Sequence, residues 1–311
     1  MKHNLKITII LIVMFIITQL IGLFVISVYQ SPETPLPYNM QPPKEVQEQF
    51  SIFHILISFV IAIGVFLLLI RLNAETFIRF WFFSVTALAL AIALNAFLTK
   101  TNIIYSAIIS LVVALILAYF KIFKRNIQIH NFSELLIYPG IAAVLVPIIN
   151  IFGIIIFLLV ISLYDIWAVW HTQFMQKMAN YQINNLRFFT GFFIPYADKK
   201  QKQKINLIKE KYIDKSDEFI EKKFKQARIK VSLAILGGGD IVFPIITAGV
   251  FYKTYLSIIP SLIIALFATL ALLTLFMFAR KGKFYPAMPF LTIGIYLGMM
   301  IDWILMSFKI I

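Results

Sequence analysis

The sequence contains no cysteine among its 311 residues. Disulfide bonds, a thiolate nucleophile and cysteine-ligated metal sites are therefore all excluded. Charged residues are scarce, at 14% of the chain, whereas 61% of the residues are hydrophobic, and the mean hydropathy is +0.90. These values lie far outside the range of soluble globular domains, so the composition predicts a polytopic membrane protein.

Two common hydrolase motifs are also missing. The sequence has no His-Glu-x-x-His segment, and its four histidines are scattered near the ends of apolar segments, at His3, His54, His130 and His171. A zinc hydrolase is therefore not expected. No Gly-x-Ser segment precedes a suitable histidine partner, which argues against a serine nucleophile. We expect neither a metal ion nor another cofactor.

Apolar segments long enough to span a bilayer recur along nearly the whole chain. They predict an all-α fold with nine transmembrane helices, at 7–29, 51–72, 77–98, 102–123, 134–149, 151–170, 231–252, 256–279 and 286–308. Pro147, Asn150 and Gly153 mark the turn between the fifth and sixth spans. The first apolar run is too long for a signal peptide, so we expect it to be retained. We divide one membrane-embedded domain into a six-helix part, an inner loop and a three-helix part, at 1–170, 171–230 and 231–311.

The distribution of basic residues predicts the orientation of these spans. With the N-terminus in the cytoplasm, 24 of the 28 Lys and Arg residues fall on inner segments, and the outside keeps Lys44, Lys100, Lys253 and Lys309. Cytoplasmic loops carry such an excess of positive charge. Nine spans then place the C-terminus outside. The net charge of +14 reflects this topology, and no nucleic-acid partner is expected.

Two loops stand out between the spans. The outer loop at 30–50 is rich in proline, which predicts an extended linker. The inner loop at 171–230 has an aromatic run at 188–196, too short to span and expected at the membrane interface. In its second half, charged residues alternate with apolar ones at helical spacing, which indicates an amphipathic helix with Ile205, Ile208, Tyr212, Ile220 and Phe224. A solvated tether between two helix groups remains the simpler interpretation of this loop.

Aspartates inside predicted spans mark a candidate site. Asp165 lies in the sixth span and Asp240 in the seventh, and a charged aspartate at the centre of a span costs about 2.5–3.5 kcal/mol on insertion scales. At ~1.5 Å per residue, the two lie about 9 Å and 15 Å from the cytoplasmic ends of their spans. They can therefore share a level, and consecutive spans tend to be adjacent. Asp302 lies about 20 Å farther out than Pro289, so we expect it at the outer end, near Lys253 or Lys309.

A pair of adjacent carboxylates would have its own chemistry. At low dielectric the two groups share one proton, because both cannot ionise together. The charged carboxylate can take a proton from water, and the neutral one can donate to a carbonyl oxygen and later to a leaving amine. Such a site requires a hydrated cavity that opens to the cytoplasm.

Three short motifs accompany these aspartates. Gly237-Gly238-Gly239 precedes Asp240 and either allows close helix packing or leaves backbone free to pair with an extended strand. Pro286-Ala287-Met288-Pro289 opens the last span, either as an ordinary helix start or as an extended segment that binds a substrate strand. Tyr164 is either an interfacial aromatic residue or a hydroxyl directed at the site.

Together these motifs resemble the presenilin/signal peptide peptidase family of intramembrane aspartyl proteases, which has Tyr-Asp, Gly-x-Gly-Asp and Pro-Ala-Leu on its sixth, seventh and ninth helices. The resemblance implies that Asp165 and Asp240 are the catalytic pair. It also implies that the substrate is bound by residues of the three motifs: Tyr164, Gly237, Gly238, Gly239, Pro286, Ala287, Met288 and Pro289. Met288 departs from the usual leucine but keeps its volume and apolar character. The cytoplasmic N-terminus and compact inner loop resemble archaeal presenilin homologues, which implies a prokaryotic cell membrane.

The sequence thus supports one main hypothesis and two alternatives. The main hypothesis is an endopeptidase that cleaves single-span membrane proteins within the bilayer. A transporter or channel could instead use the two carboxylates as proton or cation ligands. A third reading is an inactive homologue that binds and retains membrane helices.

Overall fold

The computed structural model describes residues 5–31, 34–40, 48–101, 103–124, 126–171, 189–196, 232–279 and 285–308, and also the separate positions 178, 181, 182, 186, 201, 203, 205, 207, 208 and 223. The chain forms two compact units, one of Met1–Phe192 with Gly237–Ile311 and one of Phe193–Leu236. Most of the amphipathic segment predicted in the inner loop, including Tyr212, Ile220 and Phe224, lies outside the described residues.

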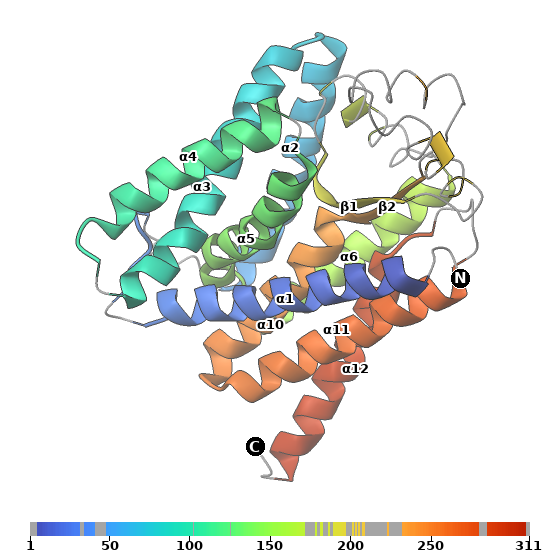
Figure 1. Ribbon diagram of the computed structural model, residues 1–311. Coiled ribbons are helices and arrows are strands. Elements are labelled where there is room, and N and C mark those ends of the chain that lie inside the picture. Colours follow the sequence, from blue (N-terminus) through green and yellow to red (C-terminus); the bar gives the residue numbers. More distant parts are fainter. Residues whose placement is uncertain are drawn as a thin grey trace. The chain divides into compact units, whose positions relative to one another are not determined.

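Helices account for most of the described chain (Figure 1). The long ones are α1 Leu5–Tyr29, α2 Glu48–Arg71, α3 Glu75–Lys100, α4 Ser106–Phe123, α5 Ile127–Leu145, α6 Ile151–Trp170, α10 Gly238–Tyr255, α11 Ile258–Phe278 and α12 Met288–Ser307. Within the described residues, seven segments are long and apolar enough to cross a membrane: α1, α3, α4, α5 with the short helix η1 (Val146–Ile148), α6, α11 and α12. The protein is therefore a multi-pass membrane protein. The count of nine spans stays a prediction.

The fifth helix shows how local sequence sets an end. It begins at Ile127, seven residues before the predicted start, because the Asn126 side chain accepts hydrogen bonds from the N–H groups of Gln128 and Ile129, at 2.9 and 3.1 Å. Such a cap satisfies donors that have no partner within the helix. The predicted turn after this helix is confirmed, since η1 follows it directly and Asn150 Oδ1 accepts from the Gly153 N–H at 2.7 Å.

The structure adds one small sheet to the predicted helical fold. Strand β1 (Gly191–Tyr196) and strand β2 (Ser232–Gly237) form a two-stranded sheet. The seventh helix consequently begins at Gly238 and not at 231. Gly237 is extended, with φ −65° and ψ 148°, and glycine weakens a helix by about 1 kcal/mol relative to alanine. Aromatic residues favour strands, which fits the formation of β1 within the aromatic run at 188–196.

The outer loop is tied to the helices through Tyr38. Its hydroxyl donates to the Ala107 carbonyl at 2.9 Å and lies 2.9 Å from Ser110 Oγ. Burial raises the pKa of Tyr38, and the hydrogen bond with Ser110 opposes this effect. The predicted linker is thus anchored at this residue.

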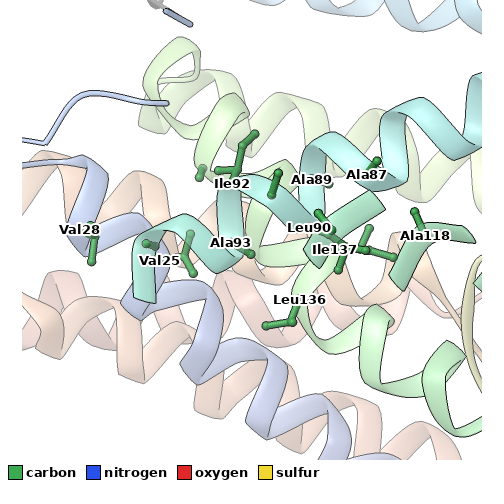
Figure 2. Close-up of a cluster of buried hydrophobic side chains, with 14 residues drawn as sticks. Val25, Val28, Ala87, Ala89, Leu90, Ile92, Ala93, Ala118, Leu136 and Ile137 are labelled. Carbon is green, nitrogen blue, oxygen red and sulfur yellow. The ribbon is translucent and has the colours of Figure 1, made fainter. Parts of the chain in front are cut away.

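Small residues let the helices of the larger unit approach closely. Helix α3 packs against α1, α4 and α5, and α11 packs against α12. Figure 2 shows part of this core, in which the residues of α3 are mainly alanine and lie among larger side chains of α1 and α5: Val25, Val28, Ala87, Ala89, Leu90, Ile92, Ala93, Leu136 and Ile137. In a bilayer, such close packing supplies attraction that the hydrophobic effect does not provide between helices.

The tightest approach is between α5 and α3 at Gly140. A Cβ atom at this position would lie 1.9 Å from the Ala89 carbonyl oxygen, which belongs to the backbone and cannot move aside. At Gly64 in α2, by contrast, an added Cβ would meet nothing within 4 Å.

We therefore expect Gly140→Ala to destabilise the protein by roughly 1–3 kcal/mol through overpacking. Gly64→Ala should leave stability unchanged or raise it by about 0.5–1 kcal/mol, because alanine is the better helix former. Thermal unfolding of both variants in the same detergent checks this difference. Equal transition temperatures would contradict the close approach of α5 and α3.

Candidate active site

Asp165 faces the beginning of α12. It is 5% exposed, and its Oδ2 accepts a hydrogen bond from the Met288 N–H at 3.0 Å. The N–H of Ala287 interacts with the same carboxylate. Met288 is the first residue of α12, so its N–H has no partner inside that helix. The positive end of the helix dipole therefore points at the Asp165 carboxylate, where it favours negative charge.

Further polar contacts hold α12 in register with α6. The Ser162 and Thr292 hydroxyl oxygens are 2.7 Å apart. The Tyr296 hydroxyl donates to the Ile155 carbonyl at 2.6 Å. Together with the Asp165 contact, these pairs run in opposite sequence directions along the two helices. They fix the depth of the proline segment relative to Asp165.

The proline segment combines two conformations. Pro286 and Ala287 precede α12, and Pro286 is buried. Pro289 lies in the first turn, where its missing N–H has no helical partner to lose. The segment is thus partly an ordinary helix start, and its first two residues precede the helix beside Asp165.

Asp240 lies at a helix terminus and not in the middle of a span. It is the third residue of α10, since Gly238 begins that helix, and it is half-buried. The sequence-based insertion cost assumed a central position, so it overstates the cost at Asp240. In the first turn, the unpaired N–H groups and the helix dipole favour a carboxylate by about 0.3–1 kcal/mol.

The three glycines before Asp240 have different surroundings. A Cβ at Gly237 would lie 3.2 Å from Asp240 Oδ2, and one at Gly238 would lie 2.7 Å from the Tyr138 hydroxyl oxygen. A Cβ at Gly239 would come no closer than 3.6 Å to Phe243, and this glycine is exposed. Gly237 therefore makes room for the Asp240 carboxylate and Gly238 for Tyr138, whereas Gly239 presents open backbone.

Helices α6 and α10, which carry the two aspartates, are in contact. The rings of Phe157 on α6 and Phe243 on α10 meet edge to face, with centroids 5.6 Å apart. The predicted adjacency of these helices is confirmed. Tyr164 is half-buried, and its ring centroid lies 6.3 Å from that of Trp167, which fits an aromatic residue near the membrane interface.

Asp302 lies away from this site, near the opposite end of α12. It is 1% exposed, and its Oδ1 has no hydrogen-bond partner among the described residues. Lys253, one of its two predicted neighbours, donates to the carbonyls of Val146, Pro147 and Ile149, at 3.2, 3.1 and 2.9 Å. The other, Lys309, lies outside the described residues.

Sequence reasoning missed a buried polar cluster beside Gly238. Glu134, on α5, accepts hydrogen bonds from Lys121 of α4 and from the Tyr138 hydroxyl. His130 lies one turn before Glu134, with its Nε2 3.6 Å from Glu134 Oε1. Lys121 is only 4% exposed. The available signal was an acidic residue at the start of a predicted span, with His130 and Tyr138 each four residues away.

The chain matches a family of known proteins. Residues 12–308 match the sequence model of the family described as signal-peptide peptidase, presenilin aspartyl protease. A search of curated protein sequences finds no match.

Two solved structures of a presenilin family intramembrane aspartate protease share the fold. The one in the C222 space group has a TM-score of 0.59 at 16% identity, covering 96% of this chain and 99% of that chain. The one in the P2 space group has a TM-score of 0.58 at 18% identity, covering 95% of this chain and 96% of that chain. Because the family match spans nearly the whole chain, the protein belongs to the signal-peptide peptidase and presenilin family and is an intramembrane aspartyl protease.

Proposed function

We propose that Asp165 and Asp240 are the catalytic pair and that the substrates are single-span membrane proteins. The contact between Met288 N–H and Asp165 Oδ2 carries this proposal. It joins the proline motif to the first aspartate, on a helix that also contacts the helix of Asp240. Three motifs from distant parts of the sequence thus converge on one region.

The chemistry follows from two carboxylates that share one proton. The ionised group removes a proton from a water molecule, whose oxygen adds to the carbonyl carbon of the scissile peptide bond. The neutral group donates its proton to the carbonyl oxygen. When the C–N bond breaks, the carboxyl that took the proton from water gives it to the leaving amine. The other carboxylate takes a hydroxyl proton from the tetrahedral intermediate as the new carboxylic acid forms, so the pair again carries one proton. No covalent intermediate or metal ion is required.

Substrate binding would use backbone that the helices leave open. A transmembrane helix must unwind locally before a peptide bond becomes accessible, and its freed backbone groups then need partners. Gly239 is exposed, and Pro286 and Ala287 precede α12 without joining it. Tyr164, Gly237, Gly238, Gly239, Pro286, Ala287, Met288 and Pro289 would line the substrate site. Such a site favours proteolysis over proton- or cation-coupled transport.

The proposed topology has nine spans, a cytoplasmic N-terminus and an external C-terminus. The distribution of the 28 Lys and Arg residues supports it. On this topology, Asp165 and Asp240 open toward the cytoplasm. The proposed location is a prokaryotic cell membrane of the archaeal type.

Replacement of either aspartate should abolish cleavage of a single-span reporter in proteoliposomes. Asp165→Asn and Asp240→Asn preserve side-chain volume but remove the acid–base group, so we expect activity to fall by about 10²–10⁴-fold. Asp302→Asn is the matched control, because it alters a buried aspartate outside the site, and it should keep wild-type activity. Undiminished cleavage by either site variant would refute the pair. A wild-type protein that neither cleaves the reporter nor binds a transition-state-mimicking inhibitor would support the inactive homologue.

Substitution of two adjacent glycines distinguishes a role in substrate binding from a role in helix packing. Gly239→Ala should fold normally, because its Cβ has room, and should raise the KM for the reporter by obstructing the approach of substrate backbone. Gly238→Ala should lower stability by roughly 1–3 kcal/mol, because Tyr138 fills that space. Thermal unfolding and reporter kinetics on both variants distinguish these effects. Wild-type KM in Gly239→Ala would remove this residue from the substrate site.

The absence of cysteine makes the topology directly testable. Lys100 and His171 are both exposed, and the proposed orientation places them outside and inside the cell, respectively. A membrane-impermeant thiol reagent should label Lys100→Cys in intact cells but label His171→Cys only after permeabilisation. The wild-type protein is an unlabelled control. The reverse pattern would invert the proposed orientation.

A further inference from the structure

A buried polar relay connects α4, α5 and Gly191 in the larger unit. Lys121 Nζ donates to Glu134 Oε1, and the Tyr138 hydroxyl donates to Glu134 Oε2. The Lys121 and Glu134 side chains are 3% and 1% exposed. At the other end of the cluster, His130 Nε2 lies 2.8 Å from the carbonyl oxygen of Gly191, the first residue of β1.

Stability alone does not account for the ion pair in this relay. Burial costs each ion several kcal/mol, and apolar residues of similar volume often replace such pairs without loss of stability. Buried ion pairs can instead hold neighbouring groups in one specific arrangement. The neighbours of Glu134 therefore indicate what the pair positions.

Tyr138 connects this relay to α10, the helix of Asp240. Its ring packs edge to face on Phe192, with centroids 6.3 Å apart, while Glu134 holds its hydroxyl. The hydroxyl occupies the space that a side chain at Gly238 would need. It also lies close enough to Asp240 for the two groups to interact electrostatically. Because both ends of Tyr138 are held, it limits where the first turn of α10 can lie.

The charges around Tyr138 are balanced. Glu134 would repel the Asp240 carboxylate if its charge were uncompensated, but Lys121 pairs with it directly. Tyr138 presents a neutral hydroxyl between the acidic residues of α5 and α10. The relay can therefore position the turn without adding a net negative charge beside the site.

We propose that Tyr138 is a positioning residue for Asp240 and that Glu134 and Lys121 hold it in place. The inference rests on the proposed catalytic role of Asp240. Tyr138 does not take part in bond making. It sets the position of the α10 turn, and displacements of about 1 Å in an active site can cost about 10²-fold in rate.

The first test compares two tyrosine hydroxyls. Tyr138→Phe keeps the ring but removes the bond to Glu134. Tyr29→Phe is the matched control, because the Tyr29 hydroxyl donates to the Ile92 carbonyl at 2.7 Å and so joins α1 to α3. We expect Tyr138→Phe to lower kcat for the reporter by about tenfold or more, with KM changed by less than about twofold. Tyr29→Phe should keep wild-type kcat. Equal kcat values per folded molecule in the two variants would overturn the inference.

The second test removes both charges of the Lys121–Glu134 pair and changes whether position 134 can accept a hydrogen bond from Tyr138. Lys121→Met with Glu134→Gln leaves an oxygen that can accept from Tyr138, whereas Lys121→Met with Glu134→Leu leaves none. Both double variants are neutral at these positions, so neither contains an unpaired buried charge. We expect the glutamine variant to retain most of the wild-type kcat and the leucine variant to match Tyr138→Phe. Equal activity in the two would show that the hydrogen bond to Tyr138 does not position the site.

Amide hydrogen exchange separates this inference from the catalytic proposal. The N–H groups of Ile241–Phe243, which pair with the carbonyls at the start of α10, should exchange faster in Tyr138→Phe than in Tyr29→Phe, whether or not the protein cleaves the reporter. If wild-type protein lacks proteolytic activity but shows this difference, only the proposed function fails. If exchange is equal while wild-type protein cleaves the reporter, only the positioning role fails.

Discussion

The hydrogen bond from the Met288 N–H to Asp165 Oδ2 joins residues 123 positions apart. It sets the level at which α12 begins relative to α6, and the hydroxyl pair of Ser162 and Thr292 continues that register. This contact places the proline segment beside the first aspartate, although the two belong to different helices. The start of α12 therefore lies beside Asp165 in the proposed site. The contact between α6 and α10 brings the helix of Asp240 next to the helix of Asp165.

Both proposed catalytic carboxylates lie at helix N-termini, although they reach them differently. Asp240 belongs to the first turn of α10, whereas Asp165 faces the first N–H of α12 from another helix. Each terminus favours negative charge by about 0.3–1 kcal/mol, and more where the geometry is partly buried. This offsets part of the cost of about 2.5–3.5 kcal/mol for an aspartate inside a membrane. The backbone thus favours a negative charge at each position.

Hydropathy predicted most helices, because an apolar run of spanning length has few alternatives in lipid. The same reasoning failed at 231–237, since β2 is apolar enough to resemble the start of a helix and its pairing with β1 is not local. The aspartates and their motifs could be found from residue type and depth. The relay could not, because Lys121 and Glu134 lie on different helices and their contact depends on how α4 and α5 pack. Local spacing around Glu134 indicated Tyr138 but not its position against Gly238.

The buried acidic residues differ in what compensates their charge. Glu134 has Lys121 and the Tyr138 hydroxyl, and Asp165 has the start of α12. Asp302 is as deeply buried as Glu134, yet its Oδ1 has no hydrogen-bond partner in the described part of the chain. An ionised carboxylate in that setting would bear most of its desolvation cost. The arrangement therefore separates acids that neighbouring groups hold by hydrogen bonds from one whose Oδ1 has no such bond among the described residues. Composition and depth alone could not make this distinction, since it depends on where each neighbouring helix begins.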